Sequence, residues 1–176
     1  SQSLYGNVGI KQGKIVGIYD QSYIPEAAKV IDAEGKVVVP GGVDAHVHIP
    51  VGSNLQRGDF ETEGRAALLG GTTTVVDFVK SIDLSLLDTF YAKREEVSKL
   101  SPVDFSFHAV LLNRKDFEEI PSLMEEGIIS FKQFMCKVDH LPCLHTGLLY
   151  EAYQLFAEYG AMSTVHAENY EIQEYL

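Results

Sequence analysis

Short runs of β-branched residues separated by turn residues mark the first forty positions of the chain. Four such runs predict strands: Val8–Ile10, Ile15–Ile18, Val30-Ile31 and Val37–Val39. Gly13-Lys14 between the first two indicates a hairpin, and Ala33-Glu34-Gly35 separates the last two as a turn. Pro40-Gly41-Gly42 ends this pattern, because proline and paired glycines break regular structure. We therefore expect a small antiparallel β element over residues 1–39.

From Gly42 onward, strand-like segments alternate with helix-like segments. The predicted strands are Gly42–Ile49, Thr72–Val79, Val103–Leu112, Ile128–Met135 and Ala161–Ala167. The predicted helices are Phe60–Leu69, Asp83–Leu100, Lys115–Glu126 with an interruption near Pro121, Thr146–Tyr159 and Tyr170–Leu176. Alternation of this kind predicts an α/β fold with a parallel sheet and crossover helices. It suits a doubly wound sheet or an eight-stranded barrel, and no GxGxxG follows the first strand to support dinucleotide binding.

Composition narrows the possible partners and location. The 176 residues have the length of one ordinary domain, and 45% of them are hydrophobic, which is enough for a packed core. A formal net charge of −11 argues against nucleic acid, and no apolar run is long enough to span a membrane. Without a signal-peptide pattern, the two cysteines, Cys136 and Cys143, fit a reducing, cytoplasmic compartment. We expect both to be ordinary packing or surface thiols.

Two histidines in Asp44-Ala45-His46-Val47-His48 give the strongest local signal. Residues two apart on a strand share a face, with Cα atoms roughly 6.6 Å apart on a rise of about 3.3 Å per residue. His46 and His48 can therefore converge on one metal ion at the end of a barrel strand. The alternative is a pair of strand histidines, one of them satisfied by backbone. Asp44 is expected to orient the strand or a ligand histidine through a hydrogen bond.

Lys132 and His166 extend this signal. Lys132 lies in a strand that should be buried, where an unpaired ammonium is costly. It either forms an ion pair or snorkels from the strand end, or it is a neutral amine that adds carbon dioxide to become a metal-bridging carbamate. His166 ends the fifth strand of the series, which favours a ligand role beside the other two signals.

The remaining histidines and acids give weaker evidence of a functional role. His108 is expected in the core and Asp77 in a structural hydrogen bond, whereas His140 and His145 are expected in a solvated loop.

Four blocks together resemble the dihydropyrimidinase and hydantoinase branch of the cyclic amidohydrolases. They are Val38–His48 (VVPGGVDAHVH), Arg65–Phe78 (RAALLGGTTTVVDF), Ser130–Met135 (SFKQFM) and Val165–Asn169 (VHAEN). The blocks fall in family order and with family-like spacing across nearly the whole chain. His108 also matches a family feature of the third strand.

The resemblance implies a (β/α)8 TIM-type barrel beside a small β-sandwich. Residues 1–39 would be part of the sandwich, and residues 40–176 would be the N-terminal half of the barrel, with about its first five strands. It also implies two divalent metal ions, usually zinc. His46 and His48 match the ligands of the first ion, Lys132 matches the carboxylated bridging lysine, and His166 matches a ligand of the second ion. The implied reaction hydrolyses a small cyclic amide, a dihydropyrimidine or hydantoin, to an N-carbamoyl amino acid.

Two departures from the family pattern lead to further expectations. Lys137 stands where the family has a tyrosine that helps to hold the carbonyl oxygen. The family takes another metal-binding histidine from the sixth strand and a catalytic aspartate from the eighth, and neither strand falls within the 176 residues. We therefore expect this segment alone to be inactive, and to form a homo-oligomer or to pair with the missing half.

Two other functional classes remain open. The chain could belong to a non-catalytic scaffold that keeps the barrel without the metals, although the four candidate ligands argue against this. It could also belong to an allantoinase-like or dihydroorotase-like ring opener, although the blocks around Lys132 and His166 favour the hydantoinase branch.

Overall fold

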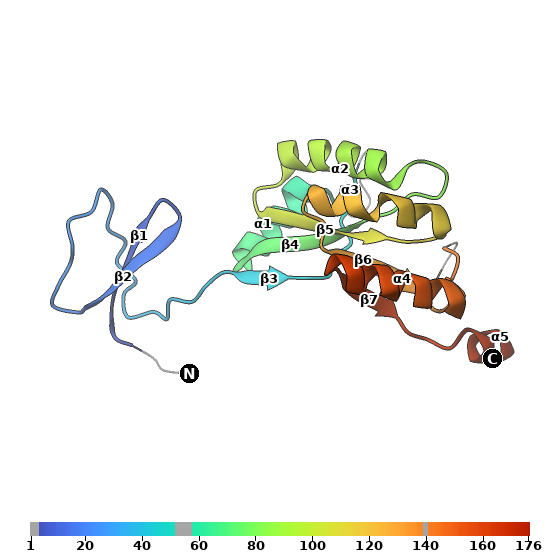
Figure 1. Ribbon diagram of the computed structural model, residues 1–176. Helices are drawn as coiled ribbons and strands as arrows, with labels where there is room; N and C mark the ends of the chain where they lie inside the picture. Colours follow the sequence, from blue (N-terminus) through green and yellow to red (C-terminus); the bar gives the residue numbers. More distant parts are fainter. Residues whose placement is uncertain (1–3, 52–57, 139–140) are drawn as a thin grey trace. The chain divides into compact units, whose positions relative to one another are not determined.

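The computed structural model describes residues 4–51, 58–138 and 141–176. The chain divides into two compact units, residues 1–39 and residues 40–176 (Figure 1). The assignment of the first unit to a β-sandwich stays a prediction, because its described strands form one hairpin.

The first unit contains the predicted hairpin. Strands β1 (Gly6–Lys11) and β2 (Lys14–Asp20) pair in antiparallel fashion. The turn residues are Gln12 and Gly13 rather than Gly13 and Lys14. Their φ angles of 52° and 73° are the two left-handed conformations that a type I′ hairpin turn requires.

The strands predicted at Val30-Ile31 and Val37–Val39 are wrong. The turn between them is present, with positive φ angles at Glu34 and Gly35, but neither segment belongs to a described strand. A strand needs neighbouring backbone to complete its hydrogen bonds, and no described segment supplies it. These apolar side chains are between 64% and 86% exposed.

Five strands of the second unit form a single parallel sheet in sequence order. They are β3 (Gly42–Asp44), β4 (Thr72–Val79), β5 (Asp104–Val110), β6 (Ser130–Phe134) and β7 (Met162–His166). A doubly wound sheet reverses its strand order at a switch point, whereas a barrel wall adds strands in one direction. The sequential, curled sheet therefore favours the barrel alternative, and these strands make up part of such a barrel (Figure 1).

Helices follow the strands. They are α1 (Phe60–Leu69), α2 (Leu86–Leu100), the 3-10 helix η2 (Arg114–Glu119), α3 (Ile120–Glu125), α4 (Thr146–Tyr159) and α5 (Tyr170–Tyr175). All of them except α5, which has no buried residue, contribute to the packing on one face of the sheet. α2 begins at Leu86 because Ser85, not Asp83, accepts the capping hydrogen bond. The helix predicted over residues 115–126 is two shorter elements, with Pro121 in the first turn of α3.

Side-chain alternation along the strands separates two apolar clusters. Val75 and Val79 of β4 join the larger cluster with α2, α3 and α4, whereas Phe78 joins a smaller cluster with Val110 and Phe134. Residues one apart on a strand point to opposite faces, so the smaller cluster marks the face turned away from the helices. Among the described residues, no helix is both long and apolar enough to cross a membrane.

Candidate metal centre

A cavity of about 550 Å³ lies where the strands of the second unit end. Its lining includes all four candidate metal ligands together with two phenylalanines: His46, His48, Lys132, His166, Phe78 and Phe134. These side chains come from segments far apart in the sequence. They meet because parallel strands carry their carboxyl ends to one edge of the sheet, which is where barrels of this kind place their sites.

His46 and His48 follow directly after β3. Regular strand structure ends at Asp44, earlier than the predicted end at Ile49, because the Asp44 carboxylate accepts the backbone N–H of His46 at 3.1 Å. One further ladder bond, from Val47 N–H to Val76 O at 3.1 Å, keeps the segment against β4. The role of Asp44 in orienting a ligand stays a prediction, and this contact is consistent with it.

The two imidazole rings lie close together over an aromatic floor. Their centroids are 5.2 Å apart at 87°, and each lies 4.7 Å from the ring of Phe78. Burial, together with the neighbouring His46, lowers the pKa of His48. A lowered pKa favours the neutral imidazole, which is the form that binds metal.

Lys132 lies on β6 with only 7% of its surface exposed. Its Nζ lies 5.2 Å from the centre of the Phe134 ring, and in the described part of the chain no carboxylate forms an ion pair with it. Burial therefore lowers the pKa of Lys132. The ion-pair alternative has no support in these contacts, and a larger fraction of the amine is neutral and nucleophilic than in a solvated lysine.

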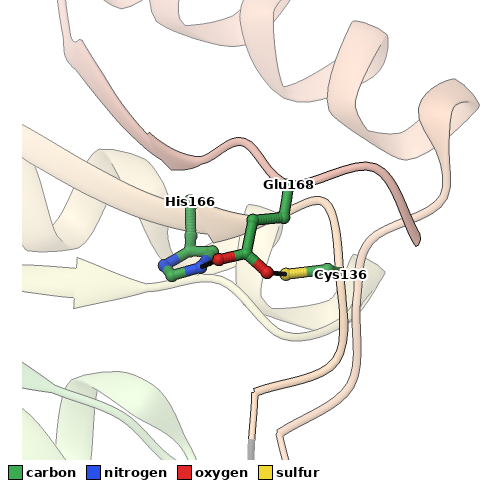
Figure 2. Close-up of side chains that lie close together, drawn as sticks. All are labelled: Cys136, His166 and Glu168. Carbon is green, nitrogen blue, oxygen red and sulfur yellow. Dashed lines mark hydrogen bonds and ion pairs between the residues drawn. The ribbon is translucent and has the colours of Figure 1, made fainter. Parts of the chain in front are cut away.

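His166 is the last residue of β7, and its ring faces a cluster that the sequence did not suggest. Nε2 lies 3.0 Å from Glu168 Oε1, and the other Glu168 oxygen lies 3.8 Å from Cys136 Sγ (Figure 2). The ligand atoms of these three residues all lie within 4.8 Å of one another, the one such set of three found among the described histidines, cysteines and acids. Burial and the nearby Glu168 raise the pKa of the Cys136 thiol.

His108 connects the segment that carries His46 to the rest of the sheet. It is buried, as expected of a core residue, with Nε2 2.8 Å from Ala45 O and Nδ1 2.7 Å from Ser130 Oγ. A carbonyl oxygen only accepts, so Nε2 donates its proton to Ala45 O. The His108 ring thereby joins β5, β6 and the residue directly before His46.

The other charged candidates have structural partners. Asp77 makes the hydrogen bond expected of it, and its partner is the largely buried ammonium of Lys93, which also donates to Phe78 O at 2.8 Å. Lys137 contacts Glu174 and Tyr170 of α5, and the hydrogen bond to Tyr170 raises the pKa of Lys137.

His145, one of the two loop histidines, is not among the residues that line the cavity. His145 is exposed, and its side chain accepts the N–H of Leu148 to cap α4. His140 lies outside the described residues.

Cys136 and Glu168 are the residues that sequence reasoning missed. Their signal was positional: Cys136 lies two residues after β6 and Glu168 two residues after β7. Adjacent parallel strands bring such positions together, but the expectation of an ordinary packing thiol hid the pairing.

Comparison with known sequences identifies related enzymes. The sequence model of the Amidohydrolase family matches residues 29–115. A D-hydantoinase of Streptomyces coelicolor is 38% identical over 96% of this chain, and the match covers 38% of that protein. A dihydropyrimidinase of Rattus norvegicus is 35% identical over 80% of this chain and 28% of its own length.

Comparison with solved structures identifies the same kinds of enzyme as the sequence comparison. A crystal structure of D-hydantoinase superposes with a TM-score of 0.83 and 34% identity, over 96% of this chain and 37% of that one. A dihydropyrimidinase from Brevibacillus agri gives a TM-score of 0.80 and 34% identity, over 92% of this chain and 36% of that one. The chain thus spans less than two-fifths of the length of these relatives.

Proposed function

Since the chain belongs to the hydantoinase and dihydropyrimidinase branch of the amidohydrolase family, we propose that its protein hydrolyses a small cyclic amide. The reaction opens a dihydropyrimidine or hydantoin ring to an N-carbamoyl amino acid. The observation that carries this proposal is the meeting of His46, His48, Lys132 and His166 around one cavity.

The donor set of the cavity fits two divalent ions, which we propose to be zinc. Imidazole nitrogens and an anionic oxygen are ligands that zinc accepts. His46 and His48 would hold one ion, His166 would bind the other, and Lys132 would bridge them once carboxylated. When bound, the ions would lower the pKa of water and polarise the carbonyl oxygen of the ring amide.

The chain's own residues prepare Lys132 for this role. Burial shifts Lys132 toward the free amine, whose nitrogen lone pair adds to the carbon of carbon dioxide. The addition forms one N–C bond, releases one proton and leaves a carbamate. Phe78 and Phe134 line the same cavity and limit water around the amine.

Metal analysis tests the site directly. The purified protein should contain divalent metal, with zinc as the expected ion, and His46→Ala should lower its content. His145→Ala is the matched control, because that histidine is exposed and caps α4 away from the cavity lining. Metal-free wild-type protein, or a metal content unchanged by His46→Ala, would contradict the proposed centre and favour the non-catalytic scaffold.

Labelled bicarbonate tests the bridging group. With ¹³C-bicarbonate, the protein should show a carbamate carbon resonance that Lys132→Met removes. Lys80→Met is the control, since Lys80 lines the same cavity but is exposed. A resonance that survives Lys132→Met would assign the carbamate to another amine.

Substrate assays separate the ring openers. We expect the full protein that carries this chain to hydrolyse dihydrouracil or hydantoin. Turnover of allantoin or dihydroorotate alone would place it in the other ring-opening classes.

We also propose that this segment does not act as an isolated monomer. In the described sheet, β3 and β7 each have a neighbour on one side, so two strand edges lie open. A second copy or the rest of the barrel would cover them, and a well-folded monomer of the 176 residues in light scattering would count against this. The two free cysteines support a reducing, cytoplasmic location.

A further inference from the structure

We propose that Cys136, His166 and Glu168 form a binding site for one thiophilic divalent cation of the zinc class. It lies beside the cavity and shares only His166 with the proposed Lys132-centred site. The proposal goes beyond the hydrolase function and does not depend on it, because neither His46, His48 nor Lys132 takes part.

The geometry of the three ligand atoms supports a single ion. Their separations are at most 4.8 Å, and the His166 and Glu168 atoms are 3.0 Å apart. Metal–ligand bonds of about 2.0–2.3 Å in a tetrahedral arrangement place ligand atoms roughly 3.3–3.7 Å apart. Side-chain movements of an ångström or less therefore suffice to close the set around an ion.

The backbone beneath the cluster is held in place. Phe134 and His166 are paired in register, and Met135 N–H donates to His166 O at 2.9 Å. This bond joins the ends of β6 and β7, so Cys136 and Glu168 leave the sheet side by side. The site is thus built on two strand ends rather than on a loop alone.

The chemistry of the set selects the ion. A thiolate, a carboxylate and a neutral imidazole provide two negative charges and one nitrogen, the mixed S/N/O set that zinc, cobalt(II) and cadmium accept. Cys136 is fully buried, whereas the side chains of His166 and Glu168 are 37% and 60% exposed. An ion would therefore enter from the His166 and Glu168 side and keep one position open for water. Binding replaces the thiol proton, which is released to solvent.

The site shares His166 with the cavity. An ion held by Cys136 and Glu168 engages a ring that the proposed catalytic centre also needs. Loading of the two sites is therefore coupled through one side chain.

Cobalt titration of the reduced, metal-free chain tests the proposal. Wild type should develop thiolate-to-cobalt charge-transfer absorption in the near ultraviolet, with about one thiolate-bound cobalt per chain at saturation. Cys136→Ser should lose this band, whereas Cys143→Ser, the matched control at the other free cysteine, should keep it. No band in wild type, or a band lost in Cys143→Ser instead, would overturn the site.

Two further variants test whether Glu168 is a ligand and whether the cobalt site is separate from the proposed catalytic centre. Glu168→Gln changes a largely exposed side chain and should weaken cobalt binding at least about tenfold, because even an outer-sphere partner contributes that much. An unchanged affinity would refute the set of three. The double variant His46→Ala and Lys132→Ala should keep the band. The charge-transfer band tests the cobalt site and the hydrolase assay tests the proposed function. The two measurements are independent, so either proposal can fail while the other stands.

Discussion

Val37–Val39 in the first unit and Val75–Val79 in the second are similar apolar segments with opposite fates. The second lies within β4, hydrogen-bonded to β5 along its length, and Val75 and Val79 are almost fully buried. The first belongs to no described strand, and its three valines are 66% to 86% exposed. β-propensity therefore forms a strand only where neighbouring backbone and a packing surface are available.

The two units also differ in the solvent exposure of their ion pairs. In the second unit, Lys93 and Asp77 form a buried pair against the aromatic rings of Phe60 and Phe107. In the first unit, Lys36 and Glu34 form an exposed pair at 3.5 Å. Substitutions matched between buried and exposed positions can measure what this difference in environment contributes.

The largest effect is expected at the buried ion pair. Lys93→Met should lower the free energy of unfolding of the second unit by about 3–5 kcal/mol, because it leaves the Asp77 carboxylate buried without its partner. Urea denaturation followed by circular dichroism measures this. Lys99→Met, which breaks the exposed pair with Glu95 on the same helix, should cost far less, because solvent already screens that pair. Equal costs would show that the buried pair is more hydrated than its contacts indicate.

The next effect comes from the core. Ile120→Ala should cost about 2–5 kcal/mol, since that side chain is fully buried and its removal leaves a cavity. Ile31→Ala, the same substitution at a residue that is 77% exposed in the first unit, should stay within about 0.5 kcal/mol. Thermal melts of the two variants test the pair together. A large loss at Ile31 would mean that the first unit is covered by something else in solution.

A smaller effect is expected at the histidine that joins three strands. His108→Phe should cost about 1–3 kcal/mol, because it leaves Ala45 O and the Ser130 hydroxyl without their shared partner. If the proposed metal centre is correct, the variant should also bind metal about tenfold more weakly through the loosened His46 segment. Ser130→Ala removes one of the two hydrogen bonds, so it should lower both the stability and the metal affinity by less than His108→Phe does. Metal affinity unchanged in folded His108→Phe would limit that residue to a packing role.

The smallest effect compares two glycines with nearly the same positive φ angle. Gly160 ends α4 with φ of 72°, and Gly13 turns the hairpin with φ of 73°, and neither would bring a Cβ within 4 Å of another atom. Alanine in this conformation costs about 1–2 kcal/mol in either place. We expect Gly160→Ala to lower the unfolding midpoint of the helical signal, and Gly13→Ala to leave it unchanged. A shift in both would indicate that the two units unfold together.

Much of the second unit could be predicted from its pattern. The strand and helix order, the boundaries of Phe60–Leu69 and Thr72–Val79, and the site candidates around His46 and Lys132 all follow from periodicity, turn residues and unusual buried charge. Boundaries shifted where side chains compete with the backbone, as the Asp44 carboxylate does at the end of β3 and Ser85 does at the start of α2.

The residues that the prediction missed depend on pairing between strands. Cys136 gave only a positional signal in the sequence, two residues after β6, because Glu168 and His166 lie 30 or more positions away. Only the parallel pairing of β6 with β7 carries it to Glu168 and His166. The exposed valines of the first unit were wrongly predicted to form a strand, because their sequence pattern does not show that no described strand pairs with them.

Single side chains and short spacings indicate which residues can be buried, which can form turns and which are able to bind metal, so these properties can be read from the amino-acid sequence. Which of these residues come into contact depends on the packing of the whole sheet. Register between parallel strands brought His46, His48, Lys132 and His166 to one cavity and placed Cys136 beside Glu168. Such meetings depend on hydrogen bonds between residues 30 or more positions apart, which no local pattern records.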